Sequence, residues 1–151
     1  MKEKMRKILV CCGPSCLSKH SMEIYEELKR KIDEVNADAQ VQTVAKATGC
    51  HGLCQRGPLL RIEPEGIFYC DVKISDVDDI VEKTVMKGEI IERLLYREES
   101  LNKRVVSQKD IGFYKGQVKI ALRNVGEIDP NCIDVYIERG GYRALKKVLT
   151  Q

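Results

Sequence analysis

The stretch KILVCCGPSC, residues 7–16, joins a short apolar run to a turn that carries cysteines. Residues 7–11 predict a short buried strand, and the Gly-Pro pair that follows has the chemistry of a turn. Residues 19–35 repeat apolar side chains at three- and four-residue steps, which predicts an amphipathic helix. Residues 40–47 partly alternate and contain β-branched side chains, which indicates a second strand. The opening half of the chain is therefore predicted to be a β-α-β unit.

The next segment predicts a β-β-α arrangement. Residues 59–62 and 67–72 have the composition of two short strands around a Pro-Glu-Gly turn, which predicts a hairpin. Ser75 is the expected N-cap of a helix that stops at Gly88. Strands and helices in this order indicate an α/β fold, a mixed sheet with helices packed on it.

The remaining part of the chain is more polar. Residues 97–110 lack periodicity and are interpreted as a linker. Beyond it, a strand is expected within residues 113–125, and Asp129-Pro130 is expected to open a short helix, which a Gly-Gly pair separates from a last helix. This tail has too few apolar positions for a core of its own, so we expect it to dock on something else.

Composition and charge exclude several classes of protein. The chain has 151 residues and a net charge of +3, too weak to indicate nucleic-acid or membrane binding. Two Phe and no Trp argue against base-stacking platforms. No apolar run is long enough for a membrane span or a signal-peptide core, so a cytoplasmic protein is expected. No serine, histidine and carboxylate grouping suggests a hydrolase, and no side chain is predicted to be catalytic.

Cysteine is the unusual feature of the composition. The chain has seven cysteines, and in a reducing cytosol these more often hold a metal or do redox chemistry than form disulfides. Cys11-x4-Cys16 and Cys50-x3-Cys54 lie in loops after the two strands of the β-α-β unit, which can meet at one sheet edge. Four converging thiolates suit an iron–sulfur cluster or zinc. Thiol redox is a third possibility, although the sequence contains no C-x-x-C pair.

Other residues near these pairs have less specific interpretations. Cys70 and Cys132 are expected to be structural thiols. His51, between two cysteines, is expected to make an outer hydrogen bond or to lie exposed in the loop. Tight turns, and backbone N–H groups near sulfur, would explain the glycines of these loops, which are Gly13, Gly49, Gly52 and Gly57.

Two motifs carry a resemblance to a known family. CCGPSC at residues 11–16, with TGCHGLC at residues 48–54 followed by Gly57-Pro58, resembles the thioredoxin-like [2Fe–2S] ferredoxins. The resemblance implies a thioredoxin-like mixed sheet with flanking helices and a [2Fe–2S] cluster. It also implies that the four cysteines of the two pairs bind the iron of that cluster: Cys11, Cys16, Cys50 and Cys54. Cys12 is not needed as a ligand by this pattern.

The resemblance extends beyond these loops. Phe68-Tyr69 and residues 87–94 resemble the N-terminal ferredoxin domain of flavoprotein subunits in NADH-linked, electron-bifurcating hydrogenases and their complex I relatives. Segments within residues 117–145 resemble the opening of the flavoprotein domain in those subunits. The implied domains are a ferredoxin domain over 1–96, a linker over 97–110 and a small, mainly helical extension over 111–151. The family's glycine-rich FMN/NADH loop and four-iron motif have no counterpart here, so the chain is expected to be a fragment or a truncated relative.

The resemblance implies a function in electron transfer. We expect one-electron transfer within a multisubunit NAD(P)H-linked oxidoreductase of the hydrogenase or NADH dehydrogenase type. The implied partners are flavoprotein and iron–sulfur or hydrogenase subunits, with FMN and NAD(H) held only by the missing domain or a partner. The alternative is a non-redox module that docks subunits, either apo or with structural zinc.

Overall fold

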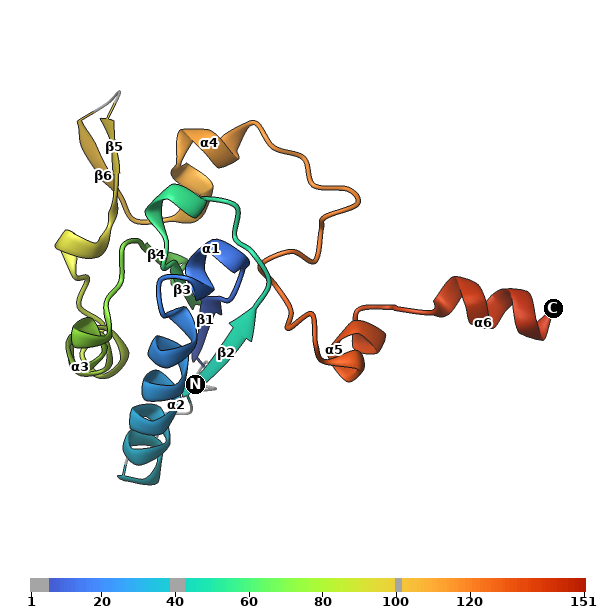
Figure 1. The fold of residues 1–151 in the computed structure, drawn as a ribbon, viewed down its shortest axis with the longest axis horizontal. Coiled ribbons are helices and arrows are strands. Elements are labelled where there is room, and N and C mark those ends of the chain that lie inside the picture. The colour runs from blue at the N-terminus through green and yellow to red at the C-terminus, as the bar shows by residue number, and fades with distance from the viewer. Residues whose placement is uncertain (1–5, 39–42, 100–101) are drawn as a thin grey trace.

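The sheet is built around strand β1, which lies between a parallel and an antiparallel neighbour. The computed structural model describes residues 6–38, 43–99 and 102–151. The sheet order is β2-β1-β3-β4, formed by β1 (Arg6–Cys11), β2 (Thr43–Thr48), β3 (Leu60–Glu63) and β4 (Ile67–Tyr69). β1 pairs parallel with β2, and the β1–β3 and β3–β4 pairs are antiparallel (Figure 1). The predicted mixed α/β sheet is confirmed, as are its four strands, although the start of the segment 40–47 lies outside the described residues.

Helix α2 covers one face of this sheet. It spans Ser21–Asp38 and follows the short helix α1 (Pro14–Leu17), in agreement with the predicted helix over 19–35. Its apolar stripe consists of Ile24, Leu28 and Ile32, each at most 2% exposed. This stripe packs in one cluster with Ile8 and Val10, which β1 directs to the same face because alternate residues of a strand share a face.

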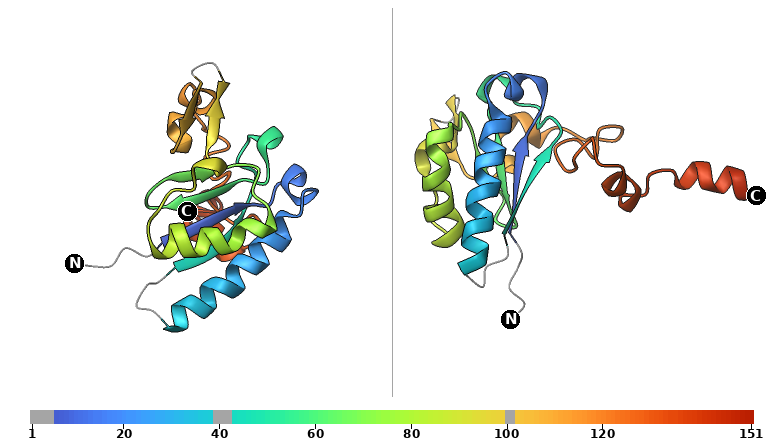
Figure 2. Two further views of the ribbon diagram at one scale, coloured as in Figure 1. Left: turned by 90° about the vertical axis from the view of Figure 1, so that its left-hand side faces the viewer. Right: turned by 60° about the horizontal axis from the view of Figure 1, so that its bottom comes forward.

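A second helical segment lies beside α2 on the same face (Figure 2). It runs through η2 (Ile74–Asp76), α3 (Val77–Asp79) and the π-helical η3 (Ile80–Met86). The prediction that Ser75 is the N-cap is wrong, because Lys73, two residues earlier, holds that position and its N–H donates to the Asp76 carboxylate at 2.8 Å. The predicted stop at Gly88 is confirmed: this residue has φ of +73°, which is typical of the position after a helix.

Residues 97–110 form local structure where the sequence indicated a linker. The strands β5 (Tyr96–Glu98) and β6 (Lys103–Val105) pair antiparallel and lead into η6 (Gln108–Asp110). The chain on either side of this hairpin covers the free edge of β4, where the Cys70 N–H bonds the Leu94 carbonyl and the Phe68 N–H bonds the Val106 carbonyl, at 2.7 and 2.8 Å. These hydrogen bonds join backbone groups and do not depend on side-chain type. The polar sequence of this segment therefore shows no periodicity from which they could be predicted. The division into domains stays a prediction.

The C-terminal part is mainly helical, as expected, but its details differ. It contains α4 (Gly112–Lys115), α5 (Ile133–Glu138) and α6 (Arg143–Thr150). The strand expected within 113–125 is wrong, because that segment forms α4 and then turns. Asp129 does not cap a helix: its carboxylate accepts the Asn131 N–H at 2.9 Å in a turn, and α5 begins after Cys132.

The last helix projects away from the sheet (Figure 1). Neither α5 nor α6 contains a buried residue, and Val148 and Leu149 are 76% and 74% exposed. That this tail docks on something else stays a prediction. In the part of the chain that the structure describes, no helix combines the length and the apolar character needed to cross a membrane.

Two leucine substitutions test where the stabilising core lies. Leu28→Ala removes a side chain that is 0% exposed between α2 and the sheet, and should lower the free energy of unfolding by about 2–5 kcal/mol. The matched change Leu149→Ala, at a site that is 74% exposed, should alter it by less than about 0.5 kcal/mol. Urea denaturation measures both, and equal losses would contradict this assignment of the core.

Candidate metal centre

The parallel pairing of β1 and β2 brings the two cysteine loops together. Cys11, the last residue of β1, is in register with Thr48, the last residue of β2. Both strands therefore end at the same sheet edge, as the β-α-β pattern predicts. Cys11 and Cys16 come from β1 and α1, while Cys50 follows β2 and Cys54 begins the short helix η1 (Cys54–Arg56).

The four sulfurs form what we call the thiol row, in the order Cys16, Cys11, Cys50, Cys54. The thiols of Cys16 and Cys50 neighbour the Cys11 thiol and both affect its pKa. The sulfurs of Cys50 and Cys54 lie 3.8 Å apart. Among the described residues, no three His, Cys, Asp or Glu side chains surround one point as a single metal ion requires. The arrangement is instead two neighbouring pairs of thiols, one pair from each loop.

Two glycines make the close approach of these loops possible. A Cβ atom on Gly57 would lie 2.6 Å from the Cys16 sulfur, and one on Gly13 would lie 2.9 Å from the Cys50 Cβ. Real Cβ atoms do not come this near to other atoms, so any larger residue would push the thiols apart. The sequence suggested tight turns as the reason for these glycines, but Gly13 and Gly57 have ordinary φ values of −68° and −73°. The structure gives lack of space as the reason instead.

Backbone amides point at two of the sulfurs. The His51 N–H donates to the Cys11 sulfur at 3.4 Å, and the Gly52 N–H donates to the Cys50 sulfur at 3.3 Å. Gly52 reaches this position with φ of +97°, a conformation that a residue with a Cβ rarely adopts. Such donors stabilise negative charge on sulfur, which a thiolate ligand needs.

The same contacts shift the acidity of the thiols. The neighbouring Cys16 thiol, with the Gly13 and His51 amides, lowers the pKa of Cys11 to about 6 despite burial. The pKa of Cys16 is raised, chiefly by its interaction with Cys11, and burial raises the pKa of Cys50. The row therefore favours a thiolate at Cys11, which is the form that binds metal.

Exposure changes along the row. Cys16 and Cys11 are buried, at 2% and 0%, whereas Cys50 is half-buried and Cys54 is exposed. The buried pair lies in a second apolar cluster with Leu59, Phe68 and Ile111. One end of the thiol row is therefore enclosed by the protein and the other end meets solvent.

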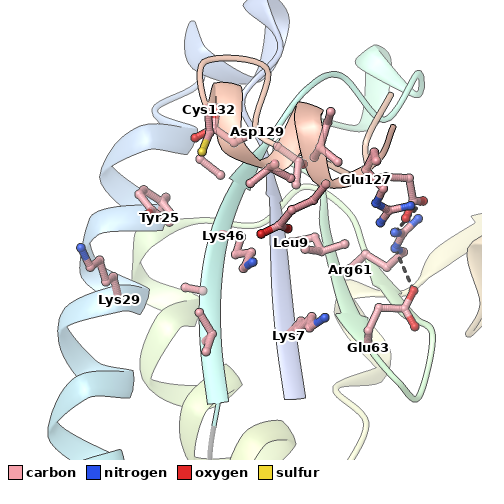
Figure 3. Close-up of a pocket in the computed structure, with 18 residues that line it drawn as sticks. Lys7, Leu9, Tyr25, Lys29, Lys46, Arg61, Glu63, Glu127, Asp129 and Cys132 are labelled. Atoms are coloured by element: carbon pink, nitrogen blue, oxygen red, sulfur yellow. Dashed lines mark hydrogen bonds and ion pairs between the residues drawn. The ribbon is translucent and has the colours of Figure 1, made fainter. Parts of the chain in front are cut away.

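The other cysteines lie outside the row. The pKa of the Cys12 thiol is raised, mainly by burial. Cys70 is 2% exposed and burial raises its pKa to about 12, in agreement with its interpretation as a buried structural thiol. Cys132 precedes α5 and lines a cavity of about 620 Å³ between the outer face of the sheet and the C-terminal segment (Figure 3). None of the four thiols of the row lines that cavity.

His51 is buried. The interpretation of the sequence that placed it exposed in the loop is therefore wrong. The His51 imidazole is 1% exposed, with Nε2 2.8 Å from the Thr48 hydroxyl, and burial lowers its pKa to about 3. The outer hydrogen bond, the other interpretation, is present. Sequence reasoning missed Tyr114, whose hydroxyl donates to the His51 carbonyl at 2.9 Å across 63 positions of sequence. No local pattern could have predicted this contact, because it depends on how residues 111–128 return to the loop.

Known proteins are similar to this chain in sequence. A family model described as thioredoxin-like [2Fe-2S] ferredoxin matches residues 2–85. A 2Fe-2S ferredoxin of Clostridium pasteurianum is 38% identical over 79 residues, which cover 52% of this chain and 76% of that protein. A 2Fe-2S ferredoxin of Aquifex aeolicus is 38% identical over 81 residues, covering 54% of this chain and 72% of that one.

Solved structures agree with these sequence matches. The crystal structure of the thioredoxin-like [2Fe-2S] ferredoxin from Aquifex aeolicus superposes with a TM-score of 0.57 at 32% identity, covering 63% of this chain and 99% of that one. A Cys-to-Ser variant of the same ferredoxin superposes with a TM-score of 0.56. The family match spans more than half of the 151 residues and includes the whole thiol row, so the chain belongs to the thioredoxin-like [2Fe–2S] ferredoxin family.

Proposed function

We propose that this chain transfers single electrons through a [2Fe–2S] cluster bound by Cys11, Cys16, Cys50 and Cys54. The observation that carries the proposal is the thiol row itself, two adjacent pairs of thiols with backbone amides aimed at the sulfurs of Cys11 and Cys50. A two-iron cluster takes two protein ligands on each iron, so the pair from each loop would hold one iron. Bound there, the cluster supplies a site that accepts and releases one electron.

The protein's own residues prepare this site in two ways. Gly13 and Gly57 leave the room that the sulfurs need, and the amides of His51 and Gly52 stabilise negative charge on them. The lowered pKa of Cys11 favours its deprotonation, and binding the metal would release the remaining thiol protons. Acid–base catalysis by side chains is not part of this function.

The exposure along the row supports a direction for electron exchange. Cys54 is exposed and Cys50 half-buried, while the Cys11–Cys16 end lies in the apolar cluster. Electron transfer is fastest at the shortest distance, so a partner would approach at the Cys54 end. The apolar surroundings at the other end limit the access of solvent, which is one of the factors that set cluster potentials.

We place this electron transfer within a multisubunit NAD(P)H-linked oxidoreductase of the hydrogenase or NADH dehydrogenase type. The support is the resemblance of segments within residues 117–145 to the opening of a flavoprotein domain. The exposed apolar side chains of α6, among them Leu145, Val148 and Leu149, are consistent with a helix that packs on a flavoprotein or iron–sulfur subunit. FMN and NAD(H) would be bound by that partner or by a further domain.

Serine substitutions test the ligand assignment. Replacing Cys11, Cys16, Cys50 or Cys54 by Ser should abolish or strongly perturb the cluster, because one iron would lose a thiolate. Replacement of Cys12, Cys70 or Cys132 should leave it unchanged, since these thiols lie outside the row. After anaerobic reconstitution, visible absorption, EPR of the reduced protein and iron, sulfide and zinc analysis report the outcome. A colourless wild-type protein that binds only zinc would refute electron transfer. Loss of the cluster in the Cys12 variant alone would assign Cys12 as a ligand in place of one of the four.

Removal of the cluster should loosen the loops before the sheet. Residues 13–18 and 49–58 carry or adjoin the ligand cysteines, so binding of the cluster should stabilise them, whereas α2 and the sheet have their own apolar core. Hydrogen exchange of apo and cluster-loaded protein should show faster exchange in those loops and unchanged protection in β1 and β3. Uniform loss of protection across the sheet would mean that the cluster stabilises the entire fold.

The chain alone should not oxidise NADH. Hydride transfer needs a flavin or an equivalent acceptor beside the nicotinamide, and the sequence contains no G-x-G-x-x-G loop to hold the dinucleotide. The loaded chain should take one electron from dithionite and stay oxidised with NADH until a flavoprotein is added. Bleaching by NADH in a flavin-free sample would contradict a simple electron relay.

A further inference from the structure

The backbone of His51 is held at both of its polar groups. Its N–H donates to the Cys11 sulfur at 3.4 Å, and its carbonyl accepts the Tyr114 hydroxyl at 2.9 Å. Tyr114 is half-buried, and its ring meets Phe68 edge-on with the centroids 6.1 Å apart. The hydroxyl therefore comes from a ring that packing already orients, and it restrains the residue whose amide contacts sulfur.

The imidazole of His51 is anchored as well. Its Nε2 lies 2.8 Å from Thr48 Oγ1, and that hydroxyl donates to the Val10 carbonyl at 3.1 Å. A hydroxyl that donates its proton to a carbonyl must accept from the imidazole, which assigns the Nε2–H tautomer. The ring also stacks on Phe68, with centroids 6.2 Å apart and 27° between the planes. Rotation of the side chain would break these contacts, so His51 gives its own amide a fixed direction.

A second contact comes from the end of the same return segment, residues 111–128, which we call the strap. The Gly49 N–H donates to the Ile128 carbonyl at 3.2 Å. Gly126, with φ of +77°, lies so close that a Cβ there would be 3.5 Å from the His51 ring and 3.6 Å from the Cys50 carbonyl. Glu127 pairs with Arg61 of β3 at 2.8 Å, which attaches the strap to the sheet. The strap therefore contacts residues 49–51 at both of its ends.

The strap lies outside residues 2–85, which match the ferredoxin family. A hydrogen bond to a ligand sulfur stabilises the more negative, reduced form of a cluster and so raises its reduction potential. We infer that Tyr114 and the backbone of residues 126–128 are positioning elements that hold the His51 amide on the Cys11 sulfur, so that the strap raises the cluster's reduction potential. This inference rests on the proposed function, because it requires a cluster on these thiols.

Tyr114→Phe is the central test, since it removes the hydroxyl and keeps the ring packed on Phe68. In the apo protein the His51 amide should exchange about fivefold faster by local opening, the effect of losing one neutral hydrogen bond. In the loaded protein the equilibrium constant for reduction should fall at least about threefold. At 59 mV per tenfold change for one electron, this lowers the reduction potential by roughly 28 mV. Gly126→Ala, which adds a Cβ against the His51 ring at a positive φ, should change both quantities in the same direction.

Tyr69→Phe is the matched control. The Tyr69 hydroxyl lies 2.8 Å from Thr84 Oγ1 and accepts the Ile91 N–H at 3.0 Å, both in the core cluster on the helical face of the sheet. This variant should lower the free energy of unfolding at least as much as Tyr114→Phe does. It should leave the reduction potential and the local exchange of the His51 amide unchanged, while the amides of β1 report any loss of global stability.

Each outcome separates the inference from the function it rests on. If Tyr114→Phe and Gly126→Ala both keep the wild-type potential and His51 exchange, the inference is overturned and the ferredoxin function stands. If Tyr69→Phe shifts the potential equally, the potential follows stability and the inference is again overturned. If the wild-type chain takes up no [2Fe–2S] cluster, the proposed function fails together with the claim on potential, and His51 exchange in the apo protein still decides whether the strap holds that amide.

Discussion

The parallel pairing of β1 with β2 is the constraint on which the rest of the site depends. Because Cys11 is in register with Thr48, the loops that follow both strands leave the sheet at one edge. A shift of one residue would turn Cys11 to the other face of the sheet and part it from Cys16 and Cys50. The register is maintained by the burial of Ile8 and Val10 against α2, so the core that stabilises the fold also positions the thiols.

The loops at this edge show what four thiols require of the surrounding backbone. Two glycines are needed because a Cβ at either position would collide with the cysteines opposite. Two amides are aimed at sulfur, and one of them belongs to a residue with φ of +97°. The site is therefore defined as much by missing side chains and by backbone donors as by the cysteines. Burial at Cys11 and exposure at Cys54 then set which end of the thiol row is sheltered and which end meets solvent.

The part of the chain beyond the family match completes the structure around this site. The chain around β5 and β6 covers the edge of β4, and Val105 and Ile111 join the apolar cluster under Cys11 and Cys16. The strap contacts the loop that carries Cys50 through hydrogen bonds to Gly49 and His51. A ferredoxin fold and its extension thus share one core at the metal centre, whereas α6 extends away from both (Figure 1).

The sequence by itself determined the features that depend on short-range pattern. Short apolar runs next to turn residues predicted β1 and the two hairpin strands, and apolar periodicity predicted α2. Cysteine spacing, together with the β-α-β order, predicted that the two cysteine loops meet. Only the tertiary structure decided that residues 97–110 close the sheet edge, that His51 is buried and that Tyr114 reaches its carbonyl. These features depend on backbone hydrogen bonds and on contacts between residues far apart in the chain. Such contacts leave no periodicity in the sequence, because the partner of each group is set by how the completed core brings distant segments together.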